Sequence, residues 1–421
     1  MFWAAEKFWG PRGAVISALL YMYAPYRAVD VWVRGALPES LAFALFPFVL
    51  YHFDALITQG QKRNFLWLAL SLAALITTHN LSLFMFLPFL GLWWIFRSFQ
   101  AKTFKHTSWL LAAGVVAGLL AAYYLLPVVL ESKYITIAQT TQGYYDFRAH
   151  FTTLQQLFLS NFWGYGGSTW GPNDTMSFAV GYLHWLLPLG LIVPALLSTR
   201  LVRQRAVFLG SIVLGTLALL LTHNKSALIW THLPLMAYIQ FPWRFLTLAA
   251  LFLALASGAV ARIGQSRIII SGLVVLLLIL NAHFFAPDIW RSISDAQQFS
   301  GALWDEQRSS ALPDFWPKSA PQMPKTFAPT DPKVILHATD YVKIQYPMVY
   351  FPGWTAKVNG QPEVAFPEGV LGLVTLRVAP NHPQIALKFR DTWPRAMGNN
   401  LSLLTLMGLF VWYFASKPSQ S

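Results

Sequence analysis

Repeated long apolar runs are the feature that most constrains this chain. Runs of roughly 17–25 mostly apolar residues, long enough to cross a bilayer as helices, recur between short polar connections. We predict ten spans, so the expected fold is an all-α polytopic membrane protein. In chain order the expected spans are residues 13–26, 38–58, 64–79, 81–98, 107–130, 177–198, 206–222, 244–262, 268–287 and 397–415.

Basic residues fall in alternate connections between these runs. Connections rich in Lys and Arg remain on the cytoplasmic side, so both termini are expected to be cytoplasmic. The net charge of +13 then belongs to the membrane topology and not to a nucleic-acid surface, and no nucleic-acid partner is expected. The residues concerned are Lys7, Arg12, Lys62, Arg63, Arg97, Lys102, Lys105, Arg200, Arg203, Arg205, Arg262, Arg267 and Lys417.

The segment 288–396 differs from the spans. Its charge is nearly balanced, with ten acids and eleven bases in residues 288–395. After a Pro-rich start, alternating apolar and polar residues predict strands at 334–338, 341–346, 355–358, 370–378 and 384–389. Asn359-Gly360 predicts a hairpin turn. The expected domains are a helical core at 1–287, an outward β-rich domain at 288–396, and a last span with a cytoplasmic tail at 397–421.

The segment 26–39 holds the densest polar cluster beside a predicted span. Asp30 and Glu39 are two of the few acids expected on the outward face, and Arg34 lies between them. An outward active site that needs a general base or metal ligand would draw on such acids. The alternative is a helix cap in which these charges pair with one another.

A second cluster lies where an outward loop re-enters the membrane at 238–245. Gln240, Trp243 and Arg244 place a hydrogen-bonding amide, an interfacial aromatic ring and a cation at one depth. A guanidinium there suits the phosphate of a lipid-linked substrate. The alternative is that Trp243 and Arg244 only anchor a helix end.

Three further residues are candidates for substrate binding. His79 closes a helical hairpin, where it is either a phosphate contact or an ordinary polar turn residue. Glu131 follows the fifth span and could instead pair with Lys133. Trp163 belongs to the aromatic loop 131–176, which suits a sugar or a lipid headgroup, or a loop resting on the bilayer. We expect a short interfacial helix near 151–159. No zinc motif is present.

The order of several motifs resembles that of a known family. Tyr26–Glu39, Thr78-His-Asn-Leu81, Tyr123–Glu131, Gln240–Phe245 and Tyr350-Phe-Pro-Gly-Trp354 resemble segments of bacterial membrane proteins of the 6-pyruvoyl-tetrahydropterin synthase-related family. That family is similar to the GT-C superfamily of membrane glycosyltransferases. The segment 26–39 resembles the second outward loop of GT-C enzymes, so the two helices and acidic loop that usually come first are expected to be missing.

The resemblance implies a membrane location and a reaction. The chain is expected in the bacterial inner membrane, moving a sugar from a polyprenyl-phosphate carrier to an envelope acceptor on the outward face. Asp30 and Glu39 would be catalytic, and Arg34, His79, Glu131, Trp163, Gln240, Trp243 and Arg244 would bind substrate. Membrane lipids are expected partners. The sequence identifies no particular cofactor, and a divalent cation is compatible with the site. The alternative is a non-catalytic transporter of lipid-linked glycans or an assembly scaffold.

Overall fold

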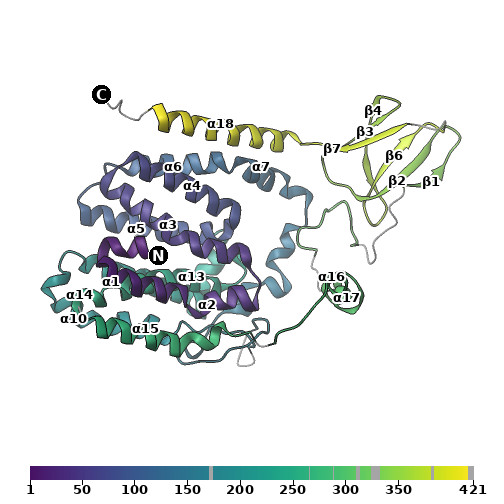
Figure 1. The fold of residues 1–421 in the computed structure, drawn as a ribbon. Coiled ribbons are helices and arrows are strands. Elements are labelled where there is room, and N and C mark those ends of the chain that lie inside the picture. The colour runs from purple at the N-terminus through teal and green to yellow at the C-terminus, as the bar shows by residue number, and fades with distance from the viewer. Residues whose placement is uncertain are drawn as a thin grey trace. The chain divides into compact units, whose positions relative to one another are not determined.

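The computed structural model describes residues 1–169, 174–264, 266–287, 289–309, 313–323, 332–380 and 384–415. The chain forms two compact units (Figure 1). Unit 1 consists of Met1–Leu119, Gly143–Arg291 and Leu409–Ser421, and unit 2 of Leu120–Gln142 and Ser292–Gly408. Unit 2 thus combines the segment expected to form an outward domain with a piece of the expected helical core. Lys417 and the rest of the expected cytoplasmic tail lie outside the described residues.

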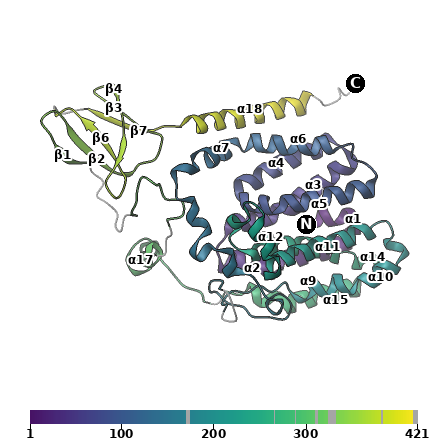
Figure 2. The same cartoon turned by 180° about the vertical axis from the view of Figure 1, so that it is seen from behind.

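Unit 1 is a helical bundle. The order of its helices is visible from two sides in Figures 1 and 2. They are α1 (Phe2–Met22), α2 (Pro25–Ala28), α3 (Leu37–Gln59), α4 (Lys62–Thr78), α5 (Asn80–Ala101), α6 (Thr107–Leu120), α8 (Leu154–Phe158), α9 (Tyr182–Gly190), α10 (Ile192–Leu197), α11 (Arg205–Thr222), α12 (Ala227–His232), α13 (Leu246–Ser257), α14 (Val260–Ile263) and α15 (Arg267–Asn281).

Helix α13 is the centre of this bundle. Every residue from Leu246 to Ser257 is buried, and α1, α3, α9 and α11 all pack against it. A helix that is apolar on all sides is stable where other helices surround it. Close approach depends on glycine: a Cβ at Gly215 of α11 would lie 2.8 Å from the Leu253 side chain, and one at Gly13 of α1 would lie 2.5 Å from the Gly258 carbonyl oxygen.

The prediction of ten membrane spans is wrong in its count. Within the described residues, five helical segments are long and apolar enough to cross a membrane, and α6 with α7 (Ala122–Glu131) would add a sixth if they form one broken span. These five are Leu37–Gln59, Asn80–Ala101, Arg205–Thr222, Pro242–Ile263 and Arg267–Phe285.

The charges and lengths of individual helices explain why fewer spans are found than predicted. Helix α1 carries Glu6, Lys7 and Arg12 and is interrupted at Gly10, where φ is 75°. Helix α4 has 17 residues and begins with two cations. The run expected at 177–198 divides into the short helices α9 and α10. The apolar runs are therefore helical at the expected places, but several are too short or too polar to count as spans.

Unit 2 holds a small antiparallel β domain. One sheet has the order β1-β2-β6-β5 and the other the order β4-β3-β7. Its helices are α7, α16 (Asp295–Phe299), α17 (Gly301–Ser309) and the first part of α18 (Trp393–Ala415). The strands are β1 (Lys333–His337), β2 (Val342–Val349), β3 (Trp354–Val358), β4 (Gln361–Glu363), β5 (Phe366–Glu368), β6 (Leu373–Val378) and β7 (Ile385–Phe389).

The predicted β pattern of this domain is confirmed. Val374 and Leu376 of β6 are fully buried at its core, and Tyr350 and Trp354 pack against that core. Asn359 and Gly360, both with positive φ, form the tight turn between β3 and β4, as their sequence predicts. The short strands β4 and β5 were not predicted, because three residues are too few to show alternation.

Candidate functional site

The candidate site begins with an irregular turn before α3. Helix α2 continues into a π-helical turn at Val29–Val33, and Gly35, with φ of 59°, then reverses the chain into α3. Arg34 therefore lies beside both acids of this segment: its Nη1 atom contacts an Asp30 carboxylate oxygen and lies 2.8 Å from Glu39 Oε2. Single π-helical turns are rare and frequent at functional sites.

Arg244 joins this cluster from the distant segment before α13. It lies in a 3₁₀ turn at Pro242–Phe245, and its Nε atom is 3.3 Å from the same Glu39 Oε2 atom that Arg34 contacts. Its Nη1 atom donates to the Ile239 carbonyl at 2.8 Å and to Gln240 Oε1 at 3.2 Å. The two segments singled out from the sequence thus meet at one carboxylate.

Aromatic side chains complete the cluster and connect it to the aromatic loop. The Tyr26 hydroxyl donates to Glu39 Oε1 at 2.9 Å and accepts from Arg34 Nη1 at 3.1 Å. The Arg34 guanidinium lies 4.6 Å from the Trp243 ring centroid. The Trp243 indole N–H donates to Ser168 Oγ at 3.1 Å, so a residue of the aromatic loop 131–176 contacts the cluster directly.

Burial shapes the electrostatics of the site. Asp30 is 0% exposed and Glu39 2%. Among the described residues Asp30 Oδ2 has no hydrogen-bond partner. Burial first, and then the charge of Glu39, raises the pKa of Asp30 well above its usual range, although Arg34 opposes this. Asp30 is therefore the acid of the cluster whose charged form its surroundings favour least.

His79 lies within the electrostatic field of the same cluster. Burial is the main cause that lowers the pKa of His79, to about 4; Glu39 opposes the shift, and the charges of Arg244 and Arg34 add to it. Its Nδ1 atom is 2.7 Å from Ser82 Oγ. Its imidazole is consequently neutral at physiological pH and suited to hydrogen bonding.

Two predicted site residues have other surroundings. Trp163 donates its indole N–H to the Ala286 carbonyl at 3.2 Å and packs against a buried group that includes Phe284. Glu131 belongs to unit 2, where Arg395 Nη2 lies 2.7 Å from its Oε2 atom. Its expected alternative partner, Lys133, instead lies 5.0 Å from the Tyr134 ring centroid. Within unit 1, the structure does not bring Trp163 into contact with the Asp30 cluster.

Sequence reasoning missed some members of the site. Tyr26 is the first residue of the segment 26–39. Its hydroxyl group, so close in sequence to the four charged residues of that segment, could have identified it as a hydrogen-bonding member of the site. Ser168 is one of several Ser and Thr residues in the aromatic loop, and nothing in the sequence distinguishes it from the others. The expected short helix in this loop is present as α8.

The acids of the cluster do not form an evident metal site. Asp30 and Glu39 both contact Arg34. Over the ranges that the structure describes, no group of three or more His, Cys, Asp or Glu side chains is arranged to hold an ion.

The apolar helices and this buried polar cluster define a helical membrane protein. Residues 3–294 match the model of the 6-pyruvoyl-tetrahydropterin synthase related domain, which describes a membrane protein, and the chain belongs to this family. The matched region contains every member of the cluster around Asp30. No curated protein and no solved structure matches the chain.

Proposed function

We propose that this chain is a GT-C-like membrane glycosyltransferase that moves a sugar from a polyprenyl-phosphate carrier to an envelope acceptor on the outward face of the bacterial inner membrane. The observation that carries the proposal is a cluster in which Arg34 and Arg244 both contact the Glu39 carboxylate and Arg34 also contacts Asp30. A carboxyl group with a shifted pKa beside fixed cations is the combination that transfer from a phosphate leaving group requires.

In this proposal Asp30 is the general base. The acceptor hydroxyl attacks the anomeric carbon of the sugar while Asp30 Oδ2, which has no hydrogen-bond partner among the described residues, takes the hydroxyl proton. The bond between the anomeric carbon and the carrier phosphate oxygen breaks, and the phosphate leaves with the electron pair. Because Asp30 is fully buried, this role requires a local rearrangement of the cluster that lets the acceptor reach it.

The arginines stabilise the departing phosphate. Arg34 has the more exposed side chain of the two, at 15% against 9% for Arg244, and a phosphate competes for it with Asp30 and Glu39. Binding of the carrier would thereby free Asp30 to act. Glu39, expected from the sequence to be catalytic, contacts both arginines, so its role here is to hold them in position.

The test is sugar transfer by purified Asp30→Asn, normalised to folded protein. The substitution preserves shape and removes the base, so transfer is expected to be lost while the elution profile of the protein remains unchanged. Normal transfer by Asp30→Asn would rule out this role for Asp30.

One observation favours the second candidate, a non-catalytic transporter or scaffold. The charges of the cluster pair with one another and are nearly inaccessible, which a purely structural ion-pair network also predicts. In that case Arg244→Ala lowers stability but leaves the affinity of the folded protein for polyprenyl phosphate unchanged.

A further inference from the structure

A long apolar groove lies in unit 1, apart from the Asp30 cluster. Its lining residues come from α8 and the following Leu159, from α9 and α10, from α11 and the turn after it, and from Leu253 of α13. Both α9 and α11 pack on α13. The groove has a volume of about 830 Å³, and none of the charged members of the Asp30 cluster lines it.

The polarity of the groove changes along its length. Ile212, Thr216 and Leu220 follow one face of α11 at intervals of four residues. Beyond the C-terminal end of α11 the lining becomes polar, with His223 and the exposed Lys225. The groove therefore has an apolar body and a cationic end, which matches the shape and polarity of an anionic lipid.

Trp185 supplies a hydrogen-bond donor within the lining. Its indole Nε1 is buried and has no hydrogen-bond partner among the described residues, while its ring packs edge-on against Phe158 at 5.4 Å. An unpaired buried N–H is costly, so this atom points to an acceptor on a ligand. Trp185 lies in the first turn of α9, one turn before Leu189, which also lines the groove.

Lys225 differs from the arginines of the Asp30 cluster in its neighbours. Its backbone N–H donates to His223 Nδ1 at 3.2 Å, and in the described part of the chain its ammonium group has no carboxylate partner. Arg34 and Arg244, by contrast, both contact Glu39. An exposed cation at the mouth of an apolar groove complements a phosphodiester.

We propose that this groove binds an anionic glycerophospholipid. The phosphodiester lies at Lys225 beside His223, an ester carbonyl accepts from Trp185 Nε1, and one acyl chain extends along Leu189, Ile192 and Ile212. The ester distinguishes this occupant from a polyprenyl phosphate, which has no carbonyl for Trp185. This site is separate from the proposed reaction centre and does not depend on its function.

The first test compares the binding of an anionic and a zwitterionic lipid in detergent, with and without the charge of Lys225. The purified chain is titrated with dioleoyl phosphatidylglycerol or dioleoyl phosphatidylcholine, and bound lipid is counted by native mass spectrometry. Phosphatidylglycerol is expected to bind at least tenfold more tightly. Lys225→Ala should weaken its binding about tenfold to a hundredfold, the usual range for a lost charge-assisted contact. The matched control Lys105→Ala, an exposed lysine outside the groove, should change nothing.

Two further variants test the groove and the ester contact. Ile212→Trp fills the apolar body and should abolish retention of phosphatidylglycerol with Lys225 intact. Trp185→Phe keeps the ring, removes the N–H, and should weaken binding about three- to tenfold. Equal binding of the two lipids, or unchanged binding in both Lys225→Ala and Ile212→Trp, would overturn the proposal. Displacement of phosphatidylglycerol by equimolar polyprenyl phosphate would also overturn it.

Discussion

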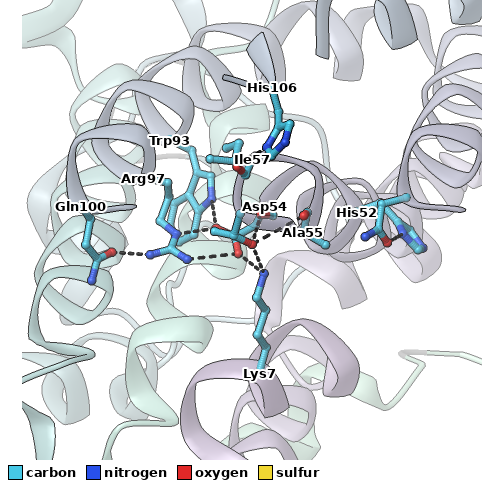
Figure 3. A network of polar contacts seen from close by, with 11 residues as sticks. Lys7, His52, Asp54, Ala55, Ile57, Trp93, Arg97, Gln100 and His106 are labelled. Carbon is cyan, nitrogen blue, oxygen red and sulfur yellow. Dashed lines mark hydrogen bonds and ion pairs between the residues drawn. The ribbon is translucent and has the colours of Figure 1, made fainter. Parts of the chain in front are cut away.

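Helix α3 carries a buried acid near each end, and the two acids have different surroundings. Glu39 lies in its first turn and Asp54 near its last, about 22 Å apart at the rise of an α-helix. Asp54 is bound by Lys7 of α1 and by Trp93 and Arg97 of α5 (Figure 3). Both carboxylate oxygens of Asp54 accept hydrogen bonds from these residues, so the cluster links α1, α3 and α5.

The cluster at Glu39 is less complete. It contains a second acid, Asp30, whose Oδ2 atom has no partner among the described residues. It also joins an irregular π-helical turn, an aromatic loop and the start of α13, and not three regular helices. Buried ions cost stability unless their partners satisfy them. Asp54 therefore has partners on both carboxylate oxygens from regular helices, whereas Asp30 is the acid for which we propose a chemical role.

The largest expected effect follows from neutralising Glu39. Glu39→Gln leaves Arg34 and Arg244 close together and buried without their shared counter-charge. We expect the free energy of unfolding to fall by about 4 kcal/mol, measured by thermal or denaturant unfolding in detergent. A loss below that of Asp54→Asn would mean that the arginines have an alternative counter-charge.

Asp54→Asn should be slightly less destabilising. It removes the shared partner of Arg97 and Lys7, but the Lys7 side chain is 21% exposed and regains some hydration. The expected cost is about 3 kcal/mol. The folded fraction should keep its polyprenyl-phosphate affinity, and a tenfold loss of that affinity would place the substrate at the wrong end of α3.

Arg244→Lys tests whether Arg244 contacts the phosphate of the carrier lipid. Lysine keeps the charge but lacks the planar fork that reaches Glu39 and a phosphate together. We expect about tenfold weaker binding of polyprenyl phosphate, and up to a hundredfold weaker for Arg244→Ala. The matched control is Arg97→Lys in the Asp54 cluster, which should not alter this binding.

The effect that is smallest at neutral pH is a pH dependence arising from His79. Its folded-state pKa of about 4 lies below the usual value of 6.5, so the unfolded chain binds the proton more readily. Stability is therefore complete above about pH 6.5 and declines as the pH falls toward 4. His79→Gln should flatten this part of the stability profile. An unchanged profile would show that His79 does not titrate as its surroundings require.

Residue chemistry in the sequence predicted much of this arrangement. The helices occur at the expected runs, and the scarcity of outward acids singled out Asp30 and Glu39. The meeting of Arg244 with Glu39 could not be derived from spacing, because it depends on how α3 and α13 pack. The contacts of Glu131 and Trp163 could not be derived from spacing either: an acid or a tryptophan at a membrane edge looks alike whether it binds a ligand or a neighbouring segment.

The number of spans and the groove beside α11 were also beyond the sequence. Hydropathy located each apolar run but not the break at Leu191, which ends α9 early. The groove is built from ordinary leucines and isoleucines, and only their three-dimensional arrangement distinguishes them from any other apolar helix face.

The central claim is that the two ends of α3 differ in function, and one paired measurement tests it most directly. Sugar transfer from a polyprenyl-phosphate carrier is measured for Asp30→Asn and Asp54→Asn, each normalised to folded protein. The account predicts about a thousandfold loss for Asp30→Asn, within the usual contribution of a general base, and nearly unchanged turnover for Asp54→Asn. Equal turnover in the two variants, or a greater loss in Asp54→Asn, would contradict it.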